Sequence, residues 1–203
     1  MTSYMLLDET IRRKAMAIEV ATARRLFNRQ EYHRMGEVGI LKLTDHVELI
    51  RGEIVEMSPM GPRHYAFVNN LNRLLVVRLI DRAIVAVQGP IVLAEDSEPE
   101  PDIAVIRLRT VPYKEREAFR EDALLLIEVA ESSLAYDRST KLRLYAEAGI
   151  PEYWVIDCLA ESVEIHRGPD AGRYRDVSRV EGAASVSPQA FPDVVLRLAD
   201  IFA

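Results

Sequence analysis

The stretch LLLIEVAESSLAYDRSTKLRLYAEAGIPEYWVID, residues 124–157, decides the fold of this chain. It begins with an apolar run that is interrupted only by Glu128, as is typical of a β-strand buried on both faces. Burying an ionised carboxylate without a partner costs several kcal/mol, on the order of other buried charges. We therefore expect a metal ion, a cationic side chain or a raised pKa at Glu128.

The rest of this stretch predicts a turn, a helix and a second strand. Asp137 can cap the helix at its N-terminal end, and Gly149 can supply the left-handed residue that ends it. Pro151 prevents the helix from continuing. Residues 152–157 then form the next predicted strand, with Trp154 as a core anchor.

Composition indicates one substantial domain that works in a reducing environment. The chain has 203 residues, of which 49% are hydrophobic, so it can fill a core. A single cysteine, Cys158, rules out an internal disulfide and a cysteine-based metal site, and it favours a cytoplasmic location. The apolar runs near the N-terminus are short and interrupted by charges, so neither a signal peptide nor a membrane span is expected.

The formal net charge of -6 argues against a protein that coats nucleic acid without specificity. Such binding draws its affinity from many contacts between cationic side chains and phosphates. An acidic total does not exclude an enzyme that acts on nucleic acid, because clustered carboxylates that hold divalent cations contribute to it.

Periodicity and turn signals predict further elements on either side of the opening stretch. A weakly amphipathic N-terminal helix is interpreted as a surface helix or a dimer arm. The charged segment 110–122 is interpreted as a solvated loop or short helix. Alternatively, it is a loop that contacts phosphate. The expected helices cover residues 8–26, 28–35 and 62–80. The expected strands lie in 47–57, as a hairpin that turns at Arg51-Gly52, and in 83–88, 91–93, 103–108, 162–167, 173–177 and 194–198.

Three charged residues together suit the hydrolysis of a phosphodiester bond. Asp102 begins one predicted strand, Glu128 lies in the next, and Lys141 follows in the helix. Two carboxylates on adjacent strands would lie about 5 Å apart at one edge of a sheet. Hard cations such as Mg²⁺ prefer carboxylate oxygens, and they can activate water and neutralise phosphate charge. Each residue also has a plainer interpretation, Asp102 as a turn residue, Glu128 as a solvated edge and Lys141 as a solvated helix residue.

Four sequence blocks in order resemble the Uma-type restriction endonuclease family, within the PD-(D/E)XK restriction-endonuclease-like superfamily. The resemblance runs from about Phe27 to the C-terminus. The blocks are EYHRMGEVGIL (31–41), VELIRGEIVEMSPMGPRH (47–64), SEPEPDIAV (97–105) and LLIEVAESSLAYDRSTKLRLYAEAGIPEYWVID (125–157). The resemblance divides the chain into a helical extension, residues 1–26, and a restriction-endonuclease-like nuclease domain, residues 27–203.

The resemblance implies an α/β fold (α+β mixed) with a central mixed β-sheet flanked by α-helices. It implies that Asp102 and Glu128 bind Mg²⁺, or Mn²⁺, with the Val129 carbonyl as a third ligand. The superfamily lysine stands two residues after the glutamate, where this chain has Ala130. Lys141 is the natural substitute, because a helix packed beside the strand could bring its ammonium group to the same point.

Five further residues are candidates for the same site. Glu53 could face the metal from the hairpin, and His64 could contact phosphate or a metal-bound water, although both could equally be structural. Glu48 and Gln88 match the family blocks without an assigned role. Tyr145 lies one helical turn after Lys141 and could line the site or fill the core.

The favoured hypothesis is a metal-dependent DNA endonuclease, a hydrolase in which metal-activated water cleaves phosphodiester bonds. DNA is then the substrate, and a homodimer is the expected assembly. The alternative is a catalytically weak or inactive protein of the same fold that acts as a binding or regulatory homodimer.

Overall fold

The computed structural model describes residues 23–42 and 44–203. Almost all of the helix expected over residues 8–26 lies outside these ranges, and residues 23–26 carry no regular secondary structure. Among the described residues, no helix is both long and apolar enough to cross a membrane.

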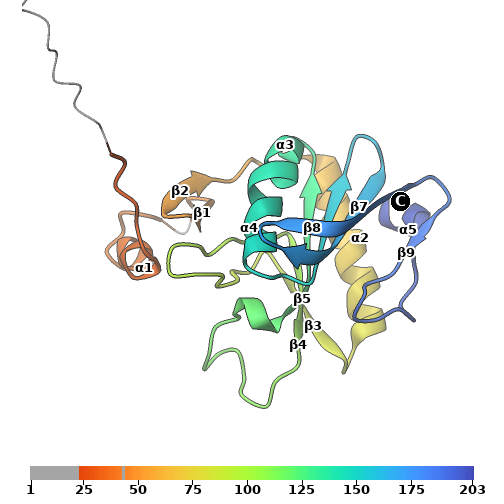
Figure 1. Cartoon of the computed structure of the whole chain (residues 1–203), viewed down its shortest axis with the longest axis horizontal. Coiled ribbons are helices and arrows are strands. Elements are labelled where there is room, and N and C mark those ends of the chain that lie inside the picture. Colours follow the sequence, from red (N-terminus) through yellow and green to blue (C-terminus); the bar gives the residue numbers. More distant parts are fainter. Residues whose placement is uncertain (1–22, 43) are drawn as a thin grey trace, which may run out of the picture.

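A six-stranded mixed sheet forms the centre of the molecule, in the strand order β3-β4-β5-β6-β7-β8 (Figure 1). β5 and β6 pair in parallel, and every other pairing in this sheet is antiparallel. The mixed α/β class expected from the sequence is therefore confirmed. The strands are β3 (Ala83–Val87), β4 (Ile103–Arg107), β5 (Ala123–Ala130), β6 (Glu152–Asp157), β7 (Ser162–Asp170) and β8 (Arg173–Glu181).

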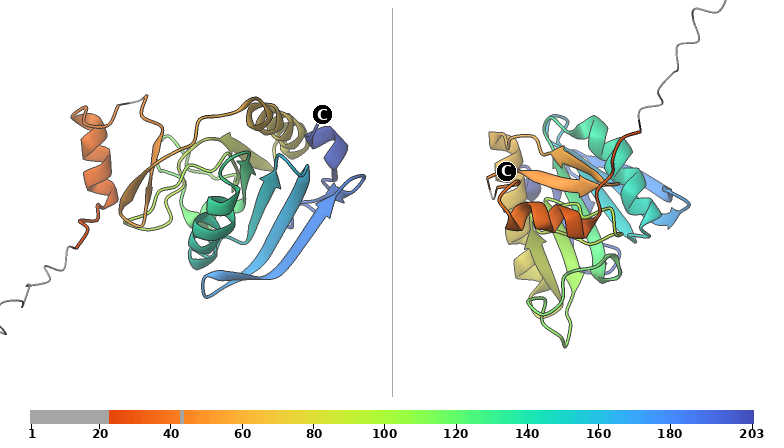
Figure 2. Two further views of the ribbon diagram at one scale, coloured as in Figure 1. Left: turned by 90° about the horizontal axis from the view of Figure 1, so that it is seen from above. Right: turned by 90° about the vertical axis from the view of Figure 1, so that its left-hand side faces the viewer.

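Helices cover both faces of this sheet (Figure 2). One face is covered by α2 (Pro62–Leu79), with α5 (Leu198–Ile201) beside it. The other face is covered by a broken helix that consists of α3 (Leu134–Tyr136), the π-helical turn η2 (Asp137–Lys141) and α4 (Leu142–Glu147). The parallel connection from β5 to β6 runs through this broken helix, in agreement with the rule that parallel strands need a helical crossover.

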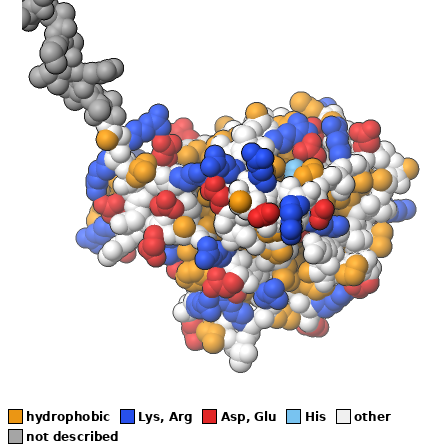
Figure 3. Space-filling model, in the orientation of Figure 1, with side chains coloured by type: hydrophobic (Ala, Val, Ile, Leu, Met, Phe, Trp, Pro, Cys, Tyr) orange, Lys and Arg blue, Asp and Glu red, His pale blue; other side chains and the backbone are white. Residues whose placement is uncertain are grey.

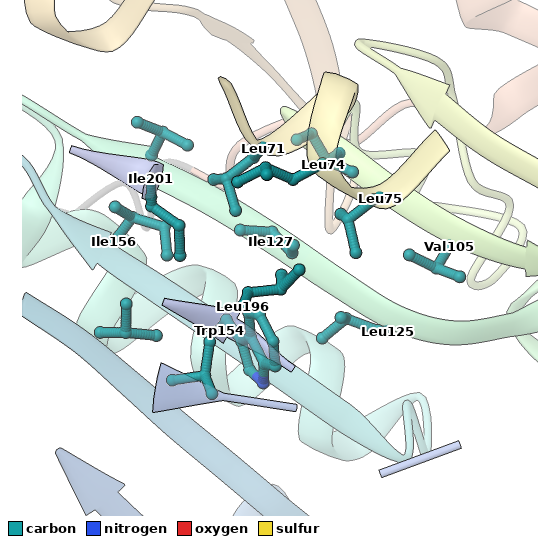
Figure 4. Close-up of a cluster of buried hydrophobic side chains, with 14 of the residues drawn as sticks. Leu71, Leu74, Leu75, Val105, Leu125, Ile127, Trp154, Ile156, Leu196 and Ile201 are labelled. Atoms are coloured by element: carbon teal, nitrogen blue, oxygen red, sulfur yellow. The ribbon is translucent and has the colours of Figure 1, made fainter. Parts of the chain in front are cut away.

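Alternate residues of β5 pack into two separate hydrophobic clusters. Leu125 and Ile127 pack with the apolar stripe of α2 and with Trp154 (Figure 4), and Val129 belongs to the same cluster. Leu126 and Ala130 belong to the second cluster, on the side of α4. This arrangement follows from the two-residue period of a β-strand, because successive side chains point to opposite faces of the sheet.

A hairpin and a short helix form a small lobe beside the central sheet (Figure 2). The hairpin consists of β1 (Val47–Ile50) and β2 (Glu53–Glu56), and it turns at Arg51 and Gly52, which both have positive φ. The helix α1 (Arg29–Glu37) begins with the predicted capping box between Asn28 and Glu31. Neither element belongs to the six-stranded sheet, so tertiary contacts alone place this lobe against it.

Several predicted elements differ from those observed. Residues 91–93 form no strand, and Val92 makes only an isolated bridge to Phe119. The strand predicted over residues 194–198 is shorter in the structure, because α5 begins at Leu198. It forms β10 (Leu196–Arg197), which pairs with β9 (Ser185–Val186). The β7–β8 hairpin is longer than predicted, since its strands continue to the turn at Ala171-Gly172. The charged segment 110–122 is mostly irregular and ends in the 3₁₀ turn η1 (Arg120–Asp122).

Candidate functional site

A cavity of about 410 Å³ lies where β4 and β5 meet the hairpin, the start of α2 and the broken helix. Its walls are strongly acidic. The carboxylates that line it are Glu48, Glu56, Glu100, Asp102, Glu128, Glu131 and Asp137. Lys141 and His64 are the basic side chains among the described residues of the lining. Such a surface favours a cation as its first ligand.

Asp102 directly precedes β4 and lies opposite Glu128, since Ile103 pairs with Ile127 in the antiparallel register. Its side chain is held from both sides. The Val129 amide donates to Asp102 Oδ2 at 2.8 Å, and His64 Nε2 lies 2.9 Å from Asp102 Oδ1. Asp102 is therefore a fixed carboxylate at the end of the sheet, not a solvated turn residue.

Glu128 is buried near the C-terminal end of β5, on the side of the sheet that faces α4. Its Oε1 accepts hydrogen bonds from Tyr145 Oη at 2.6 Å and from Lys141 Nζ at 3.2 Å. Burial raises the pKa of Glu128 to about 8, although the positive charge of Lys141 opposes this shift. Of the three expected forms of compensation, a metal ion, a cationic side chain or a raised pKa, the last two are therefore present at Glu128.

Lys141 is the last residue of the π-helical turn, and its ammonium group is buried in the site. Nζ donates to Glu48 Oε2 at 2.6 Å in addition to Glu128. Burial by itself lowers the pKa of Lys141, but the negative charges of Glu128 and Glu48 outweigh burial and raise it. Ala130, at the position of the superfamily lysine, packs in the cluster that contains Tyr145. The helical lysine therefore reaches the strand glutamate, as the sequence suggested.

The start of α2 brings His64 to the site from the opposite helical layer. Pro62 occupies the first turn, and Gly61 provides no side-chain cap. Instead Glu131 Oε2 accepts from the His64 amide at 3.2 Å, close against Gly61. Burial by itself lowers the pKa of His64. The hydrogen bond to Asp102 and the negative charges of the surrounding carboxylates together outweigh burial, so the pKa is raised.

The structure does not bring Glu53 into the cavity. Glu53 is exposed on β2 and pairs with Arg24 at 2.6 Å. The hairpin instead contributes Glu48, which is almost completely buried and also accepts from the Glu100 amide at 3.1 Å. Glu53 pairs with Ile50 and Glu48 with Val55, so the register of the hairpin decides which carboxylate lies inside. The prediction that Glu53 faces the metal site is therefore wrong.

Asp137 and Gln88 also line the cavity. Asp137 is not the N-terminal cap of the helix, because it lies inside the broken helix, and Ser133 Oγ donates to its Oδ2 at 2.5 Å. Burial raises the pKa of Asp137 to about 6, while the Ser133 hydrogen bond opposes the shift. Gln88 Nε2 lies 3.5 Å from Asp102 Oδ1 and 3.2 Å from the sulfur of Met60.

The charged segment 110–122, for which contact with phosphate was the alternative interpretation, contributes no described side chain to the cavity wall. Some of its charges pair within the segment and its flanks, and Glu117 pairs with Arg29 of α1. Arg116 Nη2 donates to Glu121 at 3.0 Å, and Arg109 forms an ion pair with Asp122. The solvated interpretation of this segment is the one that fits these contacts.

The residues of the cavity fit a hard divalent cation. Asp102 and Glu128 supply carboxylate oxygens from adjacent strands, and oxygen ligands are the ones that Mg²⁺ and Mn²⁺ prefer. Burial raises the pKa of Glu128 and so favours its protonated form, and the charge of a bound divalent cation would oppose that shift. Val129 lines the same cavity, and its carbonyl as a third ligand stays a prediction.

A second group of metal-binding residue types lies in the small lobe, where His33, Glu98 and Glu117 approach one another. Arg29 already forms ion pairs with both glutamates, at 2.8 Å for Glu117. Because a guanidinium group neutralises these carboxylates, this group is a poorer cation site than the cavity.

Sequence reasoning assigned no role to Glu48 and left Tyr145 open between the site and the core, although both contact the central charges. Glu48 stands between Val47 and Leu49, so an acidic residue in an apolar strand gave the same signal that singled out Glu128. Tyr145 has a fully buried ring, and its hydroxyl reaches Glu128. It is therefore both a core residue and part of the site.

Comparison with known proteins identifies the family and the fold. Residues 29–199 match the model of the Uma2 family, described as "Putative restriction endonuclease". Among solved structures, a "putative nuclease belonging to DUF820" from Anabaena variabilis superposes with a TM-score of 0.67 at 20% sequence identity. The match covers 82% of this chain and 95% of that chain. Among curated proteins, no relative matches.

The structural likeness supports the restriction-endonuclease-like fold, and the family match spans most of the chain, including Asp102, Glu128 and Lys141. The expected fold and family are therefore both confirmed. The chain belongs to the Uma2 family of restriction-endonuclease-like proteins.

Proposed function

We propose that this protein is a divalent-metal-dependent endodeoxyribonuclease that hydrolyses phosphodiester bonds. The observation that carries the proposal is the convergence of Asp102, Glu128 and Lys141 in one cavity, from two strands and a helix. Family membership supports nuclease chemistry, and the acidic cavity supports a requirement for Mg²⁺ or Mn²⁺.

Asp102 and Glu128 would hold the cation, and each has a partner that keeps its carboxylate in place. His64 and the Val129 amide hold Asp102 in place, and Lys141 donates to Glu128. A divalent cation in this position supplies charge for the phosphate and lowers the pKa of the attacking water.

Lys141 would stabilise the negative charge that develops on the phosphate. Two of its three N–H donors have partners in Glu48 and Glu128, which hold the ammonium group at the cavity wall. A fixed positive donor of this kind needs no reorganisation during the reaction, and such donors contribute about 100- to 1000-fold to rates. His64 lies at the same wall and could contact the phosphate once Asp102 is engaged with a cation.

The test is cleavage of supercoiled, linear duplex and single-stranded DNA with Mg²⁺ or Mn²⁺, with and without a chelator. We expect metal-dependent cleavage that is lost in Asp102→Asn and Glu128→Gln and reduced about 100- to 1000-fold in Lys141→Met. Glu53→Gln is the matched control, because this glutamate lies outside the cavity, and it should retain activity.

Intact DNA of every form at high protein concentration, with both metals present, would rule out the proposal. Equal activity of the Glu128→Gln and Glu53→Gln variants would instead remove the cavity from the mechanism while leaving a nuclease elsewhere on the chain.

The second candidate is a nuclease-fold protein that binds or regulates without cutting. One observation favours it: basic and acidic side chains are intermixed over the face shown in Figure 3, without one continuous basic surface for DNA. Calorimetry separates the two candidates. Binding of neither Mg²⁺ nor Mn²⁺, with unchanged stability in Glu128→Gln, would favour the binding protein.

We also propose a homodimer and a cytoplasmic location, and we propose residues 1–26 as an extension of a nuclease domain that covers 27–203. Light scattering of the purified chain tests the dimer. A variant that begins at Phe27 tests the extension, since it should keep the fold and the metal-dependent activity.

A further inference from the structure

Tyr145 differs from the two other buried tyrosines of its hydrophobic cluster, Tyr153 and Tyr174, in the group that accepts its hydrogen bond. The rings of Tyr145 and Tyr153 lie 4.9 Å apart edge to face, and Tyr153 stacks with Tyr174. The hydroxyl groups of Tyr153 and Tyr174 donate to backbone carbonyls, those of Asp137 and Ile150, at 3.1 and 3.0 Å. The hydroxyl of Tyr145 donates to a carboxylate, that of Glu128.

Its hydroxyl makes the two oxygens of Glu128 unequal. Oε1 accepts from Tyr145 at 2.6 Å and from Lys141 at 3.2 Å. Oε2 has one long contact, with the Asp102 amide at 3.4 Å. A carboxylate oxygen with two donors has little room for a cation, whereas Oε2 keeps free lone pairs on the side of Asp102.

Lys141 cannot fix this orientation alone. Its ammonium group lies closer to Glu48, at 2.6 Å, than to Glu128, and its long side chain has many rotamers. Tyr145 has two side-chain torsions, and its ring is clamped in the second hydrophobic cluster. The hydroxyl is therefore the rigid donor of the pair.

We propose that Tyr145 is a positioning residue, whose hydroxyl holds Glu128 Oε1 so that Oε2 is presented, together with Asp102, to a divalent cation. The inference rests on the proposed function and adds a residue that contacts neither cation nor substrate. Groups that hydrogen-bond to a metal-binding carboxylate typically contribute 10- to 100-fold to metal affinity or activity.

The test compares Tyr145→Phe with Tyr174→Phe in the full chain. Both changes remove one buried hydroxyl that donates one hydrogen bond, but Tyr174 donates to a backbone carbonyl away from the carboxylates. Titration with Mn²⁺, followed by calorimetry and by electron paramagnetic resonance of the free ion, should give a Kd about tenfold or more weaker for Tyr145→Phe. Tyr174→Phe should bind Mn²⁺ as the unchanged protein does.

Cleavage assays give a second reading of the same comparison. Tyr145→Phe should regain most of its activity at raised Mn²⁺ concentration, because its defect is a weaker affinity for Mn²⁺. Thermal unfolding should show that both variants are folded. An unchanged Kd in Tyr145→Phe overturns the positioning role, as does an equal loss in both variants. If the unchanged protein binds no Mn²⁺, the proposed function fails as well, so the two failures are distinguishable.

Discussion

The two faces of β5 serve different purposes although they alternate along the same eight residues. On the side of α2, Leu125, Ile127 and Val129 are buried in a continuous apolar core (Figure 4). On the side of α4, Glu128 lies between Leu126 and Ala130 and faces Lys141 and Tyr145. One face therefore supplies stability, and the other holds charges whose burial opposes it.

This difference shows how a small domain can afford a buried charged cluster. The apolar face is covered by the longest helix, α2, and contains most of the large buried side chains. The polar face satisfies its charges by mutual contacts among Glu48, Glu128 and Lys141. Changes on the first face should reduce stability alone, whereas changes on the second should alter activity, metal binding and pH dependence.

The largest expected effect is on the polar face. Lys141→Met leaves the carboxylate of Glu48 buried without its cation and removes the positive charge that opposes the raised pKa of Glu128, so we expect a loss of about 3–5 kcal/mol in the free energy of unfolding. Urea unfolding measures it. The double variant with Glu48→Gln should recover part of the loss, because one buried charge is removed with the lysine. A loss no larger than that of the exposed Lys114→Met would contradict the mutual stabilisation of the cluster.

On the apolar face, Ile127→Ala should cost about 2–5 kcal/mol, because it removes buried methyl groups and leaves a cavity in the core. Metal affinity should stay unchanged, since Ile127 points away from Glu128. Denaturant unfolding and Mn²⁺ titration measure the two quantities. Val77→Ala, on the exposed side of α2, serves as the control and should change stability little. Weaker metal binding in Ile127→Ala would mean that the two faces are coupled.

The pH dependence of stability should also distinguish the faces. Folding raises the pKa of Glu128 from 4.5 to about 8, so between these values the folded chain keeps a proton that the unfolded chain has released. Stability must then fall as the pH rises through this window. The pKa of Asp137 is raised from 3.8 to about 6, so this residue also makes stability fall as the pH rises between these values. Glu128→Gln should flatten the decline in thermal stability, and Glu53→Gln should leave it intact. A steeper decline in Glu128→Gln would refute the raised pKa.

The smallest expected effect on the free energy of unfolding is at the start of α2. A Cβ at Gly61 would stand 2.1 Å from Glu131 Oε2, so Gly61→Ala should displace the carboxylate that accepts from the His64 amide. Losing such a cap costs about 0.5–2 kcal/mol. Gly36→Ala, within α1, is the control, because its Cβ would meet no atom within 4 Å. Equal thermal midpoints in both variants would show that Glu131 does not stabilise α2.

Local patterns predicted most of the elements because their signals lie within a few neighbouring residues. The capping box at Asn28, the proline at the start of α2 and the left-handed Gly149 all depend on adjacent backbone groups. Residues 91–93 misled the same reasoning, because a short apolar run cannot show whether a strand partner exists. The π-helical turn also left no local signal, so Asp137 was expected to cap a regular helix.

For the site, the sequence alone singled out Glu128 as a buried carboxylate, and the tertiary structure decided its partners. The apolar run 124–130 predicts a buried strand, and burial makes an ionised carboxylate unfavourable. A carboxylate in this run therefore requires a compensating group. Whether Glu48 or Glu53 joins that group depends on the register of a hairpin outside the central sheet. The direction of the Tyr145 hydroxyl likewise follows from the packing of α4 against β5. Such contacts join residues far apart in the chain, so only the folded arrangement specifies them.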